Sequence, residues 1–409
     1  MSSRNLLVTP RIAIGFCSAS EMKSQQQSPM DVRRMHFVDF LVERQVQDVF
    51  SPASVQQISG FSLLMHRLLR GHPGKTIVVC TPRNASPESI TLVSLFVGGF
   101  MILGQNSEVG QVLSSFESLC QRFVGFCDPG NRTQPRPLTV EDCWRALHRA
   151  RCHDWINLSQ ELRPNTDPQY RGTFDVEECE HYNMQFNGKM CMVVPGKLVV
   201  FQRPVDLPAT YHWADTQAGR YFSPSFYAAA FRDVFDVAIV LRLGQSGENS
   251  YDWGTFVDEG IEVEDLHVDP TGRGLLGAVD RFLTIAQAVP APTMVALHNR
   301  ADDAGYTGSL AVAYLTRLLN FDAKAAIAWI RMVQPELLIK EADGNQGSSV
   351  LPIAELRTSS CGASLQGGGA SDNIVVERTY SLPSNYEAGI PLEPQADGFG
   401  FQPSQAIST

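Results

Sequence analysis

The chain has 409 residues, of which 44% are hydrophobic and 19% charged, a composition typical of a globular protein with room for two domains. A formal charge of -10 and a pI near 5.4 argue against a nucleic-acid or anionic-membrane surface, because both need clustered Lys and Arg. Nine cysteines without framework spacing favour a reducing, intracellular compartment over a disulfide scaffold.

The first half of the chain is expected to hold a polar tail and an α/β domain. Residues 1–30 are rich in Ser and Gln, and we predict that they are disordered and carry no secretory signal. Residues 31–165 form the predicted first domain, which includes a strand over 76–80. An apolar run over 90–104 is shorter than the roughly twenty residues that a membrane span needs, so it predicts a buried core helix. A further helix is expected over 138–147.

The second half is expected to hold a linker, a second domain and a tail. Residues 166–190 are acidic and weakly helical, and we predict that they link the domains. Residues 191–340 alternate strands and helices, which favours an α/β domain with a largely parallel sheet. Residues 341–409 are rich in Gly, Ser and Pro, and are expected to be a disordered, low-complexity tail. The expected strands lie over 192–202 (a pair), 237–241, 263–268 and 293–297, and the expected helices over 222–231, 277–287, 308–319 and 323–333.

The most informative segment joins the last predicted strand to the helix that follows it. Such a junction binds anions through its backbone N–H groups and the helix dipole. Cysteine phosphatases need His-Cys, five residues and then Arg, since a thiolate attacks phosphorus and a guanidinium holds two phosphoryl oxygens. Here His298 is followed by Asn299, whose amide is not a nucleophile. Five residues onward stands Gly305, and alignment on Thr307 instead puts Tyr306 at the arginine position. Both alignments lose the arginine.

The charge of the same loop also opposes phosphate. Arg300 follows Asn299 directly, but Asp302 and Asp303 stand where small neutral residues are needed. Two like unit charges about 4 Å apart repel by roughly 4 kcal/mol at an effective dielectric near 20, and a phosphate is a dianion. We therefore expect phosphate binding to fail together with catalysis, and we expect neither a cofactor nor a metal site.

The chain resembles the mitotic-exit dual-specificity protein phosphatases, the cell-division-cycle fourteen class, over roughly residues 35–340. The motifs that carry the resemblance occur in the family's order: FDVEECEHY at 174–182, VPGK at 194–197, the segment 251–269, RFL at 281–283 and AWIR at 328–331. The family implies two tandem protein-tyrosine-phosphatase-like domains, each a parallel-rich sheet flanked by helices, joined by a linker helix. It also implies a non-catalytic first domain and an interdomain groove for phosphoserine-proline substrates. Asp269 aligns, allowing a one-residue gap, with the family's general acid.

Plainer interpretations compete with several of these residues. Asp269 precedes a proline, and this position favours a turn residue as much as an acid. His298 is expected to stabilise its loop by hydrogen bonding. Five residues separate Cys143 from Arg149, but the spacing falls in a helical pattern without glycines and indicates chance. The similar segment that starts at Cys127 is one residue short.

Three functions remain open on sequence grounds. The first is a pseudophosphatase, not an enzyme, that serves as a protein-binding or scaffold module. The second is a weak or unconventional phosphatase for phosphoserine-proline sites, with Cys80, Cys127 or Cys143 as nucleophile. The third is a structural subunit of a cytoskeletal, microtubule-associated or ciliary assembly, with the polar tails as tethers. All three imply protein partners, neither nucleic acid nor membrane, and a location in the cytoplasm, cytoskeleton, cilium or nucleus.

Overall fold

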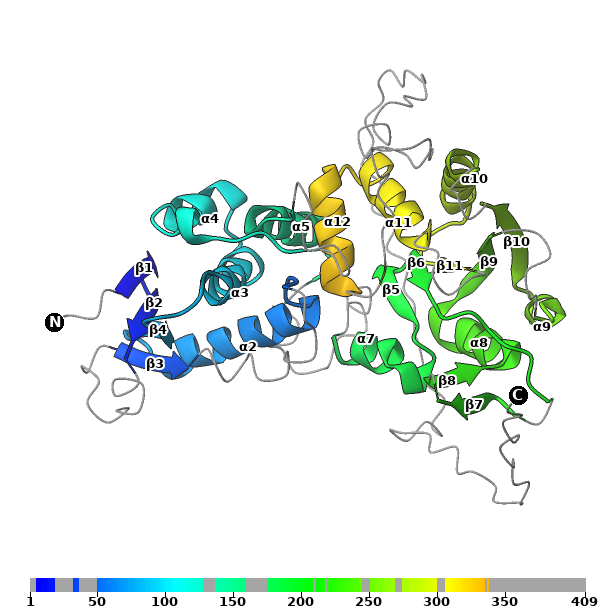
Figure 1. The fold of residues 1–409 in the computed structure, drawn as a ribbon, viewed down its shortest axis with the longest axis horizontal. Helices are drawn as coiled ribbons and strands as arrows, with labels where there is room; N and C mark the ends of the chain where they lie inside the picture. The colour runs from blue at the N-terminus through cyan, green and yellow to red at the C-terminus, as the bar shows by residue number, and fades with distance from the viewer. Residues whose placement is uncertain are drawn as a thin grey trace, which may run out of the picture.

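The computed structural model describes residues 5–18, 32–36, 50–127, 137–156, 158, 176–208, 211–217, 219–244, 251–268, 274–299, 306–334 and 337. Within these residues the chain folds into two sheet-containing halves that lie side by side, with helix α12 (Ala323–Val333) between them (Figure 1). The predicted α/β fold class, with two sheets flanked by helices, is confirmed. The tails beyond these ranges, residues 341–409 among them, lie outside the described residues.

The first half is built on a four-stranded sheet of order β1-β2-β4-β3. Its strands are β1 (Asn5–Thr9), β2 (Ile12–Cys17), β3 (Val32–His36) and β4 (Thr76–Pro82). β1 and β2 pair antiparallel, and β4 runs parallel to both β2 and β3. The prediction of a disordered tail over residues 1–30 is therefore wrong for the first two strands. Pro10 and Arg11 interrupt the apolar segment because they form the turn of a hairpin, and β2 is held from its other side by β4.

Four helices complete this half of the chain within the described residues. They are α2 (Val55–Gly71), α3 (Pro87–Gln105), α4 (Val109–Ser115) and α5 (Val140–Cys152), with a 3-10 turn at Cys120–Arg122. The predicted core helix is α3, which begins at Pro87 behind its N-cap Ser86. It is long and apolar enough to cross a membrane by length and composition, yet 78% of that window is buried inside the fold. Its surroundings are those of a core helix.

The second half is built on a five-stranded sheet of order β10-β9-β11-β6-β5. All neighbours are parallel except β5 and β6, which form the predicted strand pair, so the largely parallel sheet is confirmed. The strands are β5 (Cys191–Val194), β6 (Leu198–Val200), β9 (Val237–Gly244), β10 (Glu262–His267) and β11 (Met294–Asn299). The helices are α7 (Val176–Asn183), α8 (Pro224–Ala230) with a π-helical turn at Phe231–Phe235, α9 (Gly254–Asp258), α10 (Leu275–Ala288) and α11 (Tyr306–Arg317), besides a 3-10 turn at Gln185–Asn187. A separate hairpin joins β7 (Trp213–Thr216) to β8 (Gly219–Phe222).

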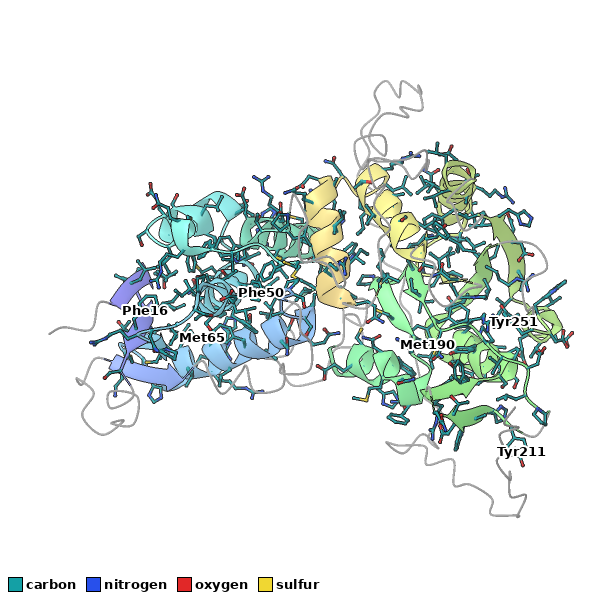
Figure 2. All side chains as sticks on the ribbon, in the orientation of Figure 1. Phe16, Phe50, Met65, Met190, Tyr211 and Tyr251 are labelled. Carbon is teal, nitrogen blue, oxygen red and sulfur yellow. The ribbon has the colours of Figure 1, made fainter. Side chains whose placement is uncertain are left out.

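Alternate residues of the central strands feed two different cores. Leu241 and Leu297 belong to the large core that also contains Phe282 of α10, whereas Val240 and Ala296 belong to a smaller core with the aromatic residues of α8 and α9. The period of two is the ordinary consequence of strand geometry. Side chains fill both halves (Figure 2), where the labelled Met65 belongs to the large core and Met190 and Tyr251 to the smaller one.

The two halves share an apolar junction centred on α5 and α12. The ring of Trp155, just after α5, lies 5.1 Å from that of Trp329 on α12 and 5.7 Å from that of Phe321. Trp329 also donates its indole N–H to the carbonyl of Val193 at 2.9 Å. The large core is therefore continuous across the predicted domain boundary. The boundary itself, at residue 165, falls outside the described residues, so the domain limits stay a prediction.

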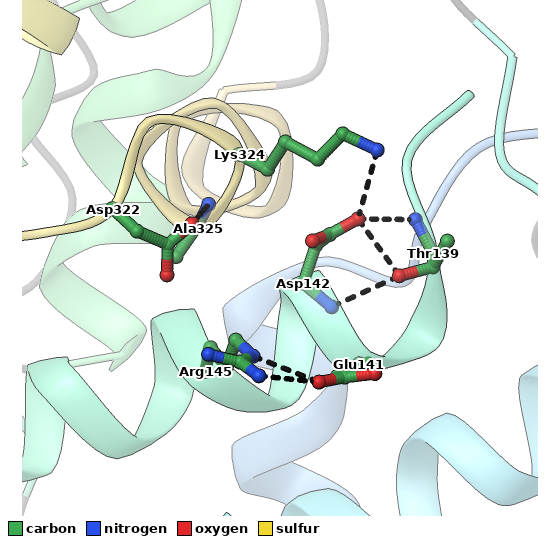
Figure 3. Close-up of polar contacts among 7 residues, drawn as sticks. All are labelled: Thr139, Glu141, Asp142, Arg145, Asp322, Lys324 and Ala325. Carbon is green, nitrogen blue, oxygen red and sulfur yellow. Dashed lines mark hydrogen bonds and ion pairs between the residues drawn. The ribbon is translucent and has the colours of Figure 1, made fainter. Parts of the chain in front are cut away.

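Polar contacts reinforce this junction where α5 and α12 begin (Figure 3). Thr139 and Asp142 form a capping box at the start of α5, with the Asp142 carboxylate accepting from the Thr139 backbone N–H at 2.8 Å. Asp322 caps α12, and Lys324 of that helix reaches Asp142 at 4.0 Å. The buried carboxylate of Asp142 thus serves both a helix cap and a contact between the halves.

Candidate functional site

The predicted site lies where parallel strands end at one edge of the second sheet. β11 is flanked by β9 and β6, and all three run in the same direction, so their carboxyl ends meet there. Ligands of open α/β sheets bind at this edge. Of the predicted site residues, His298 and Asn299 end β11 and Tyr306 begins α11. The others lie outside the described residues: Asp269, Arg300, Asp302, Asp303 and Gly305.

Asn299 bridges the end of β11 to the start of α11. Its side-chain Nδ2 donates a hydrogen bond to the hydroxyl of Thr307 at 3.2 Å, and Thr307 is fully buried in the first turn of the helix. The amide oxygen of Asn299 is buried as well and has no hydrogen-bond partner among the described residues. An amide nitrogen is a donor only. The residue at the cysteine position therefore holds the loop ends together and offers no nucleophile.

Tyr306 stands at one of the two candidate arginine positions, and its side chain is 2% exposed within the large apolar core. The side chain at this position is therefore closed to solvent and packed with apolar residues. In the second alignment of the loop, the position that would carry a phosphate-binding guanidinium is therefore occupied by an aromatic residue of the core.

His298 is buried and hydrogen-bonded at both ring nitrogens. Its Nδ1 lies 2.9 Å from the carbonyl oxygen of Asn299, which can only accept, so Nδ1 carries the proton. In the neutral ring Nε2 then accepts from the hydroxyl of Tyr251, also at 2.9 Å. The ring of Phe201 packs against the same imidazole, with the centroids 5.0 Å apart. These contacts agree with the interpretation of His298 as a stabilising residue of its loop.

A charged row that the sequence interpretation did not identify crosses the sheet beside this histidine. Strand register places Asp265 of β10, Arg242 of β9 and His298 of β11 side by side. Arg242 is buried and donates from Nε to the Asp265 carboxylate at 2.6 Å, while its guanidinium lies 5.6 Å from the ring centroid of Tyr251. Its Nη1 has no partner within the described part of the chain. A charged residue inside the apolar run of β9 was the available signal.

The alternative cysteines occupy structural positions. Cys143 is fully buried on α5, where desolvation, and then the charge of Asp142, raise the pKa of its thiol far above the ordinary value. Arg149, which has the phosphatase spacing from it, donates instead to the carbonyl of Leu319 at 2.5 Å. Cys80 is buried within β4, and Cys127 is partly exposed. Among the described residues, moreover, no group of three or more His, Cys, Asp or Glu side chains could hold a metal ion.

Sequence comparisons show which known proteins this chain is similar to. A family model described as the N-terminal half of dual specificity protein phosphatases matches residues 14–150. The tyrosine-protein phosphatase CDC14 homolog of Schizosaccharomyces pombe is 24% identical over 312 residues, which cover 75% of this chain and 54% of the relative. The chain is thus similar to the dual-specificity phosphatases of the CDC14 family.

Two vertebrate members of the CDC14 family give the range of similarity. Human dual specificity protein phosphatase CDC14C is 26% identical over 251 residues, covering 60% of this chain and 49% of the relative. The CDC14AB phosphatase of Danio rerio is 31% identical over 202 residues, covering 49% of this chain and 29% of the relative. The chain thus spans about half the length of these CDC14 relatives or less.

Solved phosphatase structures also match part of the chain. The structure of a putative protein tyrosine phosphatase from Leishmania major is 16% identical and covers 35% of this chain and 82% of its own, with a TM-score of 0.28. The structure of PTPMT1 is 17% identical and covers 37% of this chain and 86% of its own, also with a TM-score of 0.28.

Proposed function

We propose that this CDC14-like chain is a pseudophosphatase that serves as a protein-binding or scaffold module. The observation that carries the proposal is the bond between Asn299 and Thr307: the residue at the cysteine position is an amide spent on tying a strand to a helix. The core position of Tyr306 supports it, because the alignment that keeps the Thr-Gly-Ser segment in register leaves no guanidinium for phosphate. The loss of a nucleophile alone lowers turnover about a millionfold in a serine enzyme.

A binding experiment tests the phosphate half of this proposal. Isothermal titration of the purified chain with inorganic phosphate and with tungstate should give no saturable heat at millimolar concentrations. The same titration of Asn299→Ala is the matched control, since this variant removes only the bridging amide. Saturable oxyanion binding to the wild-type chain that Asn299→Ala or Thr307→Val abolishes would contradict the proposal.

The partner of the module is proposed to be a protein, in a cytoskeletal, microtubule-associated or ciliary assembly within the cell. The chain resembles the CDC14 phosphatases but lacks the nucleophilic cysteine and the phosphate-binding arginine. This combination favours a protein that keeps the family's binding surface without its reaction. Pull-down from cell extract with the full chain, compared with a variant truncated after residue 340, separates binding by the folded part from tethering by residues 341–409. A chain that stays monomeric and recovers no protein in either form would count against the scaffold role.

Similarity to the CDC14 phosphatases also keeps a weak phosphatase as the second candidate, since the curated relatives are named phosphatases. Of the three cysteines first considered, Cys80 and Cys143 are buried, which leaves Cys127 as the accessible one. If this candidate is correct, any vanadate-sensitive turnover disappears in Cys127→Ser. It persists in the control variant Cys120→Ser, which removes another accessible thiol.

A further inference from the structure

A thiol, an imidazole and a carboxylate form a hydrogen-bonded chain on the outer surface of the first half, in the opposite half from the degenerate loop. Cys152 and His148 stand one turn apart on α5, with Sγ 3.8 Å from Nδ1. The Nε2 of His148 lies 2.8 Å from a carboxylate oxygen of Glu108. Cys152 is exposed, so a small molecule can reach its sulfur.

The carboxylate fixes which ring nitrogen faces the thiol. An ionised carboxylate only accepts hydrogen bonds, so Nε2 of His148 carries the proton that Glu108 receives, and Nδ1 is left with its lone pair toward Cys152. The tautomer needed to take a proton from the thiol is therefore the one that the contacts select.

Arg151 holds this carboxylate in place. Its Nη2 donates to the second oxygen of Glu108 at 3.0 Å, and its Nη1 donates to the carbonyls of Ile102 and Ser107 at 2.9 and 3.1 Å. The guanidinium thereby ties α5 to the connection between α3 and α4, from which Glu108 projects. A carboxylate that orients a histidine, which in turn faces a thiol, is the arrangement of an activated cysteine nucleophile.

We propose that Cys152, His148 and Glu108 form a thiol-activation site that reacts with low-molecular-mass disulfides. The proton of Cys152 passes to Nδ1 of His148, and Sγ attacks one sulfur of the disulfide R–S–S–R. A new S–S bond joins Cys152 to one half, the old S–S bond breaks, and the leaving R–S⁻ takes the proton from Nδ1. The products are a mixed disulfide on Cys152 and one R–SH, so no other oxidant is consumed.

The reactivity of Cys152 should depend on His148, because Cys152 lies at the C-terminal end of α5. Cys152 is the last residue of the helix, where unpaired carbonyls give a partial negative charge that disfavours a thiolate. Without the imidazole, this sulfur should react no faster than an ordinary exposed thiol. The exposed Cys120 is such a thiol in the same half, and its Sγ lies 3.3 Å from the backbone carbonyl oxygen of Phe116.

The test is a site-resolved rate of mixed-disulfide formation. The reduced full chain is incubated with excess 2-hydroxyethyl disulfide, quenched with acid and mapped by peptide mass spectrometry. Cys152 should be modified about a hundredfold faster than Cys120, the low end of what a positioned general base contributes. In His148→Gln and Glu108→Gln the rate at Cys152 should fall to that of Cys120 or below, whereas Glu117→Gln, the same change at another exposed carboxylate, should leave it unaltered.

Equal rates at Cys152 and Cys120 in the wild-type chain would overturn the proposal, as would a Cys152 rate that both His148→Gln and Glu108→Gln leave unchanged. The buried Cys143 reports on folding in every sample. If its modification in His148→Gln shows that the variant is unfolded, the rate in Glu108→Gln decides: a fall supports the site, and an unchanged rate refutes it.

Discussion

Replacing Tyr306 with arginine should destabilise the protein, although arginine is the residue that a phosphate-binding loop needs at this position. The side chain is 2% exposed in the large core. Truncating a buried aromatic residue costs about 3–5 kcal/mol, and an unpaired buried guanidinium costs several kcal/mol more. We expect Tyr306→Arg to lower the free energy of unfolding by at least about 4 kcal/mol, a large part of the roughly 5–15 kcal/mol available to a domain.

Guanidinium chloride denaturation, followed by far-ultraviolet circular dichroism, measures this loss as a shift of the midpoint at constant slope. Tyr306→Phe is the control, because it keeps the ring and should change stability by about 1 kcal/mol. An Arg variant whose stability lies within about 1 kcal/mol of the wild type would refute the reasoning. Such a result would mean that the position turns toward the loop and could again serve an anion.

Three further predictions concern the packing and the polar contacts of the fold. Gly98→Ala places a Cβ 2.4 Å from ring atoms of Trp144 and should cost about 1–3 kcal/mol in the same denaturation assay, whereas Gly60→Ala, with open space around it, should be neutral or stabilising. Thr139→Ala removes an N-cap and should cost about 1 kcal/mol, seen as a lower midpoint; no change would show that the capping box contributes nothing. Asp265→Ala leaves the guanidinium of Arg242 buried and unpaired, and should lower the free energy of unfolding by about 3 kcal/mol in thermal or chemical denaturation. A loss below about 1 kcal/mol would show that the pairing of Arg242 with Asp265 contributes little to stability.

Periodicity predicted the elements whose signal is local. The alternation of apolar runs and helical segments in the second half gave the strands β9, β10 and β11 and the helices α10 to α12 within a few residues of their observed bounds. The apolar run of α3 and the Thr139 cap of α5 were likewise visible in the sequence. These elements depend on side chains close together along the chain, which is why sequence patterns suffice for them.

Elements that depend on distant partners were missed. β1 and β2 are short, and what keeps them in place is β4, about sixty residues farther along the chain. The Ser- and Gln-rich composition of the surrounding residues hid them. The contact of α12 with α5, which makes the core continuous across both halves, is likewise a tertiary contact that no local pattern encodes.

The same distinction holds at the site. The strand-to-helix junction and the replacement of the cysteine by Asn299 could be predicted from spacing alone. The neighbours of His298 could not be predicted in this way. Tyr251, which hydrogen-bonds to it, is distant in the sequence, and Arg242 lies beside it only through the register of β9 and β11. The burial of Tyr306 is also a property of the folded core. The sequence shows only that an arginine is absent at this position, whereas the structure shows that a core aromatic residue occupies it.

The most direct test of the account is phosphate release from a phosphoserine-proline peptide and from an aryl phosphate, measured side by side for the wild-type chain and Asn299→Ala. The account predicts that the two proteins release phosphate at the same background rate, with and without vanadate. A vanadate-sensitive rate in the wild-type chain that survives repeated purification and is lost in Asn299→Ala would contradict it.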